Sequence, residues 1–257
     1  MDPYRYDPVP APSARHGIPA RERRLGFAGA EAWAPHAAAS RDFIIEAARA
    51  SERRDRVVVL GSGPLVDVPL DVLSEAFDEV VLVDILHPPE ARRLARRYPN
   101  VHRHRVDVSG IVEAIHTQVS ESAAAPLPEP LATLPASVPD ADLIVSANLL
   151  SQLPLLPRLY LKYHTTRSED EVEAYAVAII RAHLAALSAA LGCACLISDA
   201  QVLYVDGERM LAGEDPLHGV DIGAGDRAWR WDFAPRPEHQ SDLDVRHRVA
   251  GIRNFLL

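Results

Sequence analysis

Cysteine is scarce in this chain of 257 residues: only Cys193 and Cys195 occur, one residue apart within an apolar run. Two cysteines placed in this way supply neither a disulfide framework nor a four-ligand zinc site. We interpret them as small residues of a buried strand, in which inward and outward positions alternate. We expect no bound metal.

Long apolar runs are also missing. No uninterrupted apolar segment approaches the roughly 20 residues that span a bilayer. The segment Met1–Pro12 is polar and rich in proline, whereas a secretory signal has a charged head followed by an apolar stretch. We therefore expect no membrane partner and a cytoplasmic location.

Positive charge is in deficit, with 27 Lys and Arg against 36 Asp and Glu, a formal net charge of −9. Such a balance repels polyanions and disfavours nucleic acid as a partner. Two basic stretches, Arg15–Arg24 and Arg92–Arg105, are interpreted as solvated surface. An RNA-binding patch on the second stretch remains an alternative, and salt would weaken such binding steeply. We expect a small-molecule partner, and a homodimer remains open.

The chain has enough apolar residues, 48 %, to fill one sizeable α/β core. We divide it into residues 1–52, an N-terminal extension with a helical cap, and residues 53–257, the catalytic and binding domain. The first 25 or so residues contain five prolines and are predicted to be extended or mobile. A helical pattern then covers Glu31–Ala50, with Ser40 as a candidate cap before Arg41.

Strands and helices alternate after this lead-in, which predicts a parallel sheet covered on both faces. Glu169–Leu191 is predicted as the longest helix and Ala123–Pro139, with five prolines, as a loop. Gly207–Asp226 is predicted as a second loop. Two final strands without a helix between them predict an antiparallel pair. The expected strands are Arg56–Leu60, Glu79–Asp84, Val101–Val106, Asp142–Ala147, Cys193–Ser198, Ala228–Phe233 and Val245–Phe255, and the other expected helices are Val68–Phe77, Pro89–Tyr98 and Gly110–Val119.

Glycines and acids stand where the first three expected strands end, the edge at which open α/β sheets bind ligands. Gly61 and Gly63 follow the first strand and let a ligand approach the backbone closely. Asp84 ends the second strand, about 20 residues further on, as expected for an acid that holds ribose hydroxyls. Asp107 ends the third strand, where it could meet an adenine amino group. Together these residues indicate an adenosine ligand.

The character of the turn distinguishes between adenosine ligands. A dinucleotide fingerprint requires a third small residue where this chain has Val66. Asp67 and Asp71 lie at the expected start of the next helix, where their charge opposes a pyrophosphate. S-adenosylmethionine has no phosphate and carries a sulfonium cation, so the acidic turn suits it.

The segment Val57–Ser198 resembles the class I S-adenosylmethionine-dependent methyltransferases. The first glycine-rich motif of that family matches Val57–Pro64, and the fourth motif matches Asp142–Leu150. The resemblance assigns the ribose to Asp84 and the adenine to Asp107. It implies a Rossmann-like doubly wound fold, mostly parallel, with strand order 3-2-1-4-5-7-6 and a closing antiparallel hairpin over Ala228–Phe255. Unlike the family pattern, this chain has neither an acid at the start of the first motif nor a third glycine.

Further site residues follow from the motifs and from the resemblance. Asn148 and Gln152 follow the fourth strand and are our candidate catalytic residues, although Ser151 and Gln152 could instead start a helix. Arg41 resembles positions that reach the methionine carboxylate of the cofactor, and surface pairing is its alternative. The remaining predicted cofactor contacts are Ser62, Pro64, Ile85, Val108, Asn148 and Leu149, and the predicted substrate contacts are Trp33, His36, Ser151, Tyr160, Tyr163, His164 and Asp199, with Trp229 and Trp231 as further pocket candidates.

Methyl transfer from S-adenosylmethionine to an oxygen or nitrogen of a small molecule is thus the predicted activity. A nicotinamide-dependent oxidoreductase is a weaker alternative, because Tyr160 is followed four residues later by His164 rather than by lysine. A catalytically silent protein of the same fold, which binds the ligand without turnover, is a second alternative. An RNA methyltransferase that uses Arg92–Arg105 is a third, and the net charge disfavours it.

Overall fold

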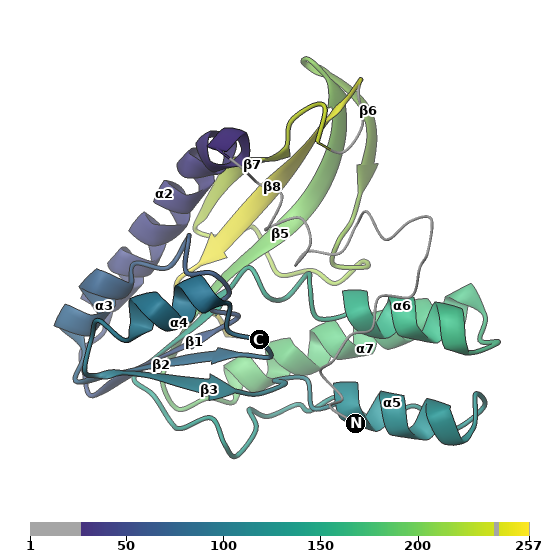
Figure 1. Ribbon diagram of the computed structural model, residues 1–257, viewed down its shortest axis with the longest axis horizontal. Helices are drawn as coiled ribbons and strands as arrows, with labels where there is room; N and C mark the ends of the chain where they lie inside the picture. The colour runs from purple at the N-terminus through teal and green to yellow at the C-terminus, as the bar shows by residue number, and fades with distance from the viewer. Residues whose placement is uncertain (1–26, 239–241, 257) are drawn as a thin grey trace.

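The computed structural model describes residues 27–238 and 242–256, and it contains one mixed sheet of eight strands (Figure 1). The strand order is β3-β2-β1-β4-β5-β8-β7, with β6 paired to β5 outside this path. This confirms the predicted Rossmann-like order, because β7 and β8 are the expected sixth and seventh strands. The strands are β1 (Arg56–Leu60), β2 (Glu79–Asp84), β3 (Val101–Arg105), β4 (Leu143–Ala147), β5 (Cys193–Asp206), β6 (Arg209–Glu214), β7 (Arg227–Ala234) and β8 (Asp244–Ile252).

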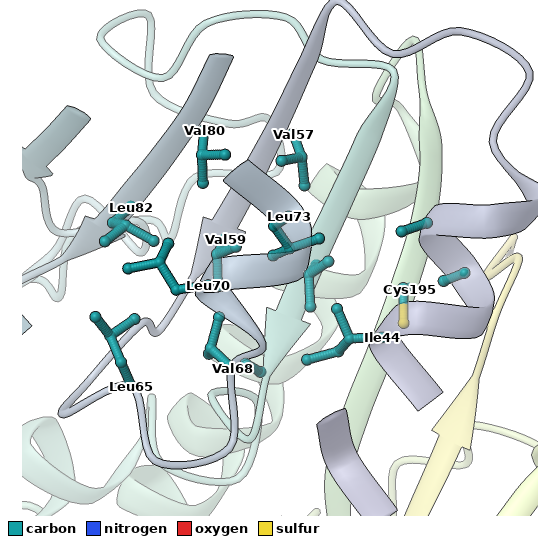
Figure 2. Packing of buried hydrophobic residues seen from close by; sticks show 14 of the residues in the cluster. Ile44, Val57, Val59, Leu65, Val68, Leu70, Leu73, Val80, Leu82 and Cys195 are labelled. Atoms are coloured by element: carbon teal, nitrogen blue, oxygen red, sulfur yellow. The ribbon is translucent and has the colours of Figure 1, made fainter. Parts of the chain in front are cut away.

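Helices cover both faces of the parallel part of the sheet. They are α2 (Phe27–Ala50), α3 (Leu70–Ala76), α4 (Pro89–Ala95), α5 (Val112–Glu121), α6 (Leu155–His164) and α7 (Glu169–Ser188). Alternate residues of β1 face the two layers: Val57 and Val59 belong to the core with α2 and α3, and Val58 and Leu60 to the core with α7. Figure 2 shows the first of these cores. All four side chains are fully buried, as a strand covered on both faces requires.

The antiparallel part extends well beyond this body. β5 has 14 residues, and its second half pairs with β8 on one side and with β6 on the other. In Figure 1 these strands rise away from the parallel strands, with α2 along β7. Cys195 is buried, as predicted, but Cys193 is exposed, because it is the first residue of β5 and lies at the end of the sheet. No helix in the described part of the chain is long and apolar enough to cross a membrane.

Several predicted boundaries were wrong. The helix α2 is continuous, and Ser40 is a fully buried residue inside it rather than a cap, because Ser40 lies on the same buried stripe as Phe43 and Ala47. With 24 residues α2 is longer than α7, which has 20 and ends at Ser188. The helix α3 begins only at Leu70. β6 lies within the expected loop Gly207–Asp226, and residues 1–26 of the expected extension lie outside the described residues.

Candidate functional site

The parallel strands β1 to β4 bring their carboxyl ends to one edge of the sheet, as predicted. The glycine turn after β1 is fastened to β2, since the N–H groups of Gly61 and Ser62 donate to the carbonyl of Val83 at 2.9 and 3.3 Å. Gly61 has φ +73° and Gly63 φ +47°, a conformation that side chains disfavour. The turn is therefore held in a fixed shape next to the end of β2.

Asp84, the last residue of β2, connects the glycine turn to that strand. One carboxylate oxygen accepts from Gly63 N–H at 2.8 Å, and the other accepts from Leu86 N–H at 3.0 Å. Burial raises the pKa of the Asp84 carboxyl, and these two backbone hydrogen bonds oppose the shift. The carboxylate can accept about two more hydrogen bonds, because each of its oxygens has two lone pairs.

Asp107 anchors the beginning of α5. Its Oδ1 accepts from the backbone N–H and the hydroxyl of Ser109 at 2.9 and 2.5 Å, and its Oδ2 accepts from Val112 N–H at 2.9 Å. These bonds give Asp107 a structural role in addition to the predicted contact with adenine. The neighbouring Val108 is buried, and the carbonyl of Ile85 accepts from the Arg105 guanidinium at 3.1 Å.

Asn148, the first residue after β4, is buried and has φ +48°. Its Nδ2 donates to Asp67 of the glycine turn at 2.7 Å and lies 3.2 Å from His36 Nε2. Its Oδ1 is buried without a hydrogen-bond partner. Gln152 donates to the Asn148 carbonyl at 2.6 Å and so supports this turn. Asn148 thus connects β4, the glycine turn and α2.

Aromatic rings from β7 surround His36 of α2. The indole N–H of Trp229 donates to His36 Nδ1 at 3.0 Å, and the Trp231 ring stacks on the imidazole with a centroid distance of 4.0 Å. Burial lowers the pKa of His36, although Asp67 and Asp199 act in the opposite direction. Trp33 donates from its indole N–H to the Phe233 carbonyl at 2.9 Å. Trp33 and His36 therefore fix α2 on β7.

A second polar group lies just after β4 and in the middle of β5, which continues past its predicted end at Ser198 to Asp206. Ser151 donates from its hydroxyl to Asp199 Oδ2 at 3.2 Å, and Asp199 Oδ1 is 3.1 Å from His247 Nδ1 of β8. The latter two atoms are close without the alignment of a hydrogen bond, and both are buried, as is the unpaired Trp231 Nε1. Buried polar groups in proteins are normally paired, so unpaired atoms here mark a place for a polar ligand or water.

Four predicted residues lie elsewhere in the fold. Tyr160 and His164 of α6 stack on each other at 4.4 Å, and Tyr160 also contacts His116 of α5. Tyr163 is 54 % exposed. Arg41 is exposed on α2. None of these contacts joins the four residues to the glycine turn, so the substrate contacts of the three α6 residues and the methionine-carboxylate contact of Arg41 stay predictions.

Comparisons with known proteins show a likeness among solved structures only. No family model and no curated protein matches the chain. An amino pentose methyltransferase of Micromonospora echinaspora, CalS10, solved with S-adenosylmethionine bound, is 18 % identical at TM-score 0.34. That match covers 70 % of this chain, which spans about half of CalS10 (54 %).

Two further structures have similar scores. The 1,6-didemethyltoxoflavin-N1-methyltransferase of Burkholderia thailandensis, with S-adenosylhomocysteine bound, is 18 % identical over 95 % of this chain and 93 % of its own, at TM-score 0.33. The N-methyltransferase NodS of Bradyrhizobium japonicum is 9 % identical over 82 % and 84 %, at TM-score 0.35. With TM-scores below 0.5, these likenesses do not establish an activity, and function is inferred from the site itself.

The sequence prediction of the site omitted Asp67 and His247. Asp67 entered only as part of an acidic turn, and its bond to Asn148 joins residues 81 positions apart. His247 lies at a buried position of β8 between the buried Val245 and Val249. A polar residue at an inward position of a strand requires a partner. That requirement is the signal that could have identified His247.

Proposed function

We propose that this chain binds S-adenosylmethionine at the carboxyl edge of β1 to β4 and transfers its methyl group to an oxygen or nitrogen of a small-molecule acceptor. The proposal rests on one observation: the Gly61–Gly63 turn, Asp84, Asp107 and Asn148 lie along one edge of the sheet. Sequence motifs and geometry agree at these positions.

The adenosine half of the cofactor suits the residues at this edge. A Cβ added to Gly63 would find no atom closer than the Gly61 carbonyl at 3.9 Å, so the open side of Gly63 offers room to a ligand. Asp84 retains acceptor capacity for two ribose hydroxyls. Asp107 and Val108 follow β3, on the adenine side. Gly61 has a different role, because its missing Cβ makes room for Leu149.

The methionine half carries an ammonium group and a sulfonium, and the chain offers negative charge for them. Asp67 is partly exposed, and Asn148 presents an unpaired buried oxygen as an acceptor. Residues 61–69 contain Asp67 and neither lysine nor arginine. Coulombic attraction therefore favours a cation over an anion at this turn.

The same region is unsuited to a nicotinamide dinucleotide. A pyrophosphate binds where a glycine turn leads directly into the N-terminus of a helix. Here α3 begins at Leu70, nine residues after Gly61, and has Pro69 as its N-cap. This separation adds to the charge of Asp67 in disfavouring the oxidoreductase alternative.

When bound, S-adenosylmethionine supplies a methyl carbon already activated by its sulfonium, for in-line displacement by a nucleophile. The contribution of the chain is orientation and exclusion of water. The glycine turn and Asp84 fix the adenosine, while Asn148, held by Asp67 and His36, fixes the methionine end. Trp229 and Trp231 pack over His36 and keep water from this side.

Ser151, Asp199 and His247 are proposed to receive the acceptor. Ser151 follows β4 and contacts Asp199 of β5, which faces His247 of β8. Asp199 Oδ1 and His247 Nδ1 are buried and have no hydrogen-bond partner. An acceptor hydroxyl or amine loses one proton as its bond to the methyl carbon forms and the carbon–sulfur bond breaks. A histidine beside a carboxylate is suited to take that proton.

Calorimetric titration tests the proposed cofactor. We expect S-adenosylmethionine and S-adenosylhomocysteine to bind in the micromolar range and NAD not to bind. Asp84→Ala should abolish binding, because the lost ribose bonds to a charged acceptor contribute about 1.5 to 3 kcal/mol each. Asp71→Ala, which removes an exposed acid of α3, is the matched control and should bind normally. Binding of NAD alone would refute the assignment.

Turnover separates an enzyme from a silent binder. Formation of S-adenosylhomocysteine should be followed with a panel of small amines and phenols as acceptors. Methylation of any of them that Asp199→Asn abolishes would support the proposed acceptor site. Tight cofactor binding with no methylated product across a broad panel would favour the silent alternative.

A further inference from the structure

The mixed sheet ends in three edge strands, and two of them are protected against pairing with another chain. β3 exposes the charged side chains of Arg103 and Arg105, a common protection of edge strands. β7 carries Arg227, which forms an ion pair with Glu46 of α2, and packs against that helix. The third edge, β6, therefore determines how the sheet can interact with a partner.

All six residues of β6 are exposed, including Met210 at 62 % and Leu211 at 48 %. Figure 1 shows this strand on the outer side of the raised arm. Its four central residues, Met210 to Gly213, are uncharged, with Arg209 before them and Glu214 after them. An exposed, uncharged edge of this kind is a template for strand addition.

The charges at the two ends of β6 complement each other in a two-fold arrangement. If β6 of one copy pairs in antiparallel fashion with β6 of another about an axis between Leu211 and Ala212, Arg209 stands opposite the partner's Glu214, and Glu214 opposite the partner's Arg209. Opposite charges across a strand pair are favourable. Neither residue forms an ion pair within the described part of the chain.

A β-bulge in β6 makes this register geometrically possible. Tyr204 pairs with Ala212 and Val205 with Met210, so Leu211 is an extra residue on β6. In an antiparallel ladder, successive residues direct their N–H and C=O groups alternately to the two sides. Without the bulge, Met210 and Gly213 would direct these groups to opposite sides. With it, both direct them to the same side, as a pair of facing residues requires.

We propose that β6 is a self-association surface, at which two copies of this chain form a two-fold dimer with a continuous sheet. A six-residue strand pair falls below the roughly 1,200 Å² of a standard interface, so the dimer should be weak and exchange rapidly. This inference is independent of the proposed methyltransferase activity.

Charge reversal with analytical ultracentrifugation of the full chain tests the proposal. The wild type should pass from monomer to dimer between low and high micromolar concentration. Arg209→Glu and Glu214→Arg should each remain monomeric over this range, because each places like charges opposite one another twice. The double variant should regain the wild-type dimer. An equimolar mixture of the two single variants should also dimerise, since every facing pair is then of opposite charge.

Two controls keep the result interpretable. Circular dichroism and the melting temperature should be the same for all four proteins, because both side chains are exposed. Glu208→Arg, in the turn before β6, is the matched charge reversal outside the pairing register and should leave the dimer intact. A wild type that stays monomeric at high micromolar concentration would overturn the proposal, as would single variants that dimerise normally or fail to dimerise when mixed.

Discussion

The two glycines of the turn after β1 provide a test that separates folding from binding. A Cβ at Gly61 would lie 2.8 Å from Leu149 Cβ and 3.1 Å from the Ala147 carbonyl oxygen, at φ +73°. The left-handed conformation costs about 1 to 2 kcal/mol, and displacement of Leu149 adds about 1 to 2 kcal/mol of overpacking. Gly61→Ala should therefore lower the free energy of unfolding by about 2 to 4 kcal/mol, or the melting temperature by roughly 4 to 16 °C.

Gly63→Ala should behave differently. Its Cβ would meet no atom within 3.9 Å, so only the cost of φ +47°, about 1 to 2 kcal/mol, falls on stability. The added methyl group would project into the space proposed for the cofactor. We expect the affinity for S-adenosylhomocysteine to fall about tenfold or more, the equivalent of 1.4 kcal/mol or more.

Urea unfolding and calorimetric titration of both variants provide the measurement. We expect opposite results for the two variants. Gly61→Ala should mainly lose stability, and Gly63→Ala should mainly lose affinity for S-adenosylhomocysteine. If Gly63→Ala binds S-adenosylhomocysteine as the wild type does, no ligand lies over this glycine. If Gly61→Ala is as stable as the wild type, the close packing of Leu149 has been misjudged.

Two further predictions concern charge and protonation. Asp67→Asn should reduce the ratio of the affinities for S-adenosylmethionine and S-adenosylhomocysteine by roughly fivefold, about 1 kcal/mol, because the two ligands differ in the sulfonium charge. The control is Asp71→Asn, and an equal reduction of this affinity ratio by the control would contradict the prediction. Burial lowers the pKa of His183 from its usual 6.5 to about 4, so the unfolded state binds more protons between these values and stability is lost as pH falls through this window. The contribution of His183 to the free energy of unfolding should fall by about 2 kcal/mol between about pH 7.5 and pH 5, and urea unfolding should detect this loss. His183→Gln can still hydrogen-bond Ser146 and should weaken the pH dependence of stability.

Sequence patterns predicted the strands β1 and β2 to the residue. Both are continuous apolar runs that end in glycine or aspartate, as strands buried on both faces do. β6 was missed because glycine and acidic residues suggested a loop. The pair Asp206–Gly207 was nevertheless a hairpin signal, and Gly207 and Glu208 form the two-residue turn between β5 and β6.

The site was predictable where motifs are local and less so where distant segments meet. Asp84 ends one recognisable strand and Asn148 follows another, so their place at the edge of the sheet could be deduced. The partners of Asn148 come from α2 and from the glycine turn, and Asp199 meets His247 only because β8 pairs with β5. The pairing register of strands that are far apart along the chain cannot be deduced from a single sequence. These contacts therefore required the structure.

The contacts that run from Trp229 through His36 to Asn148 have a practical consequence for engineering. A replacement for α2 taken from another protein would leave the indole and the amide without their shared imidazole, even if the new helix had the correct length and apolar stripe. The exchangeable unit is thus α2 together with β7. Chimaeras that carry both should keep the geometry around Asn148, whereas those that carry one of them should lose it.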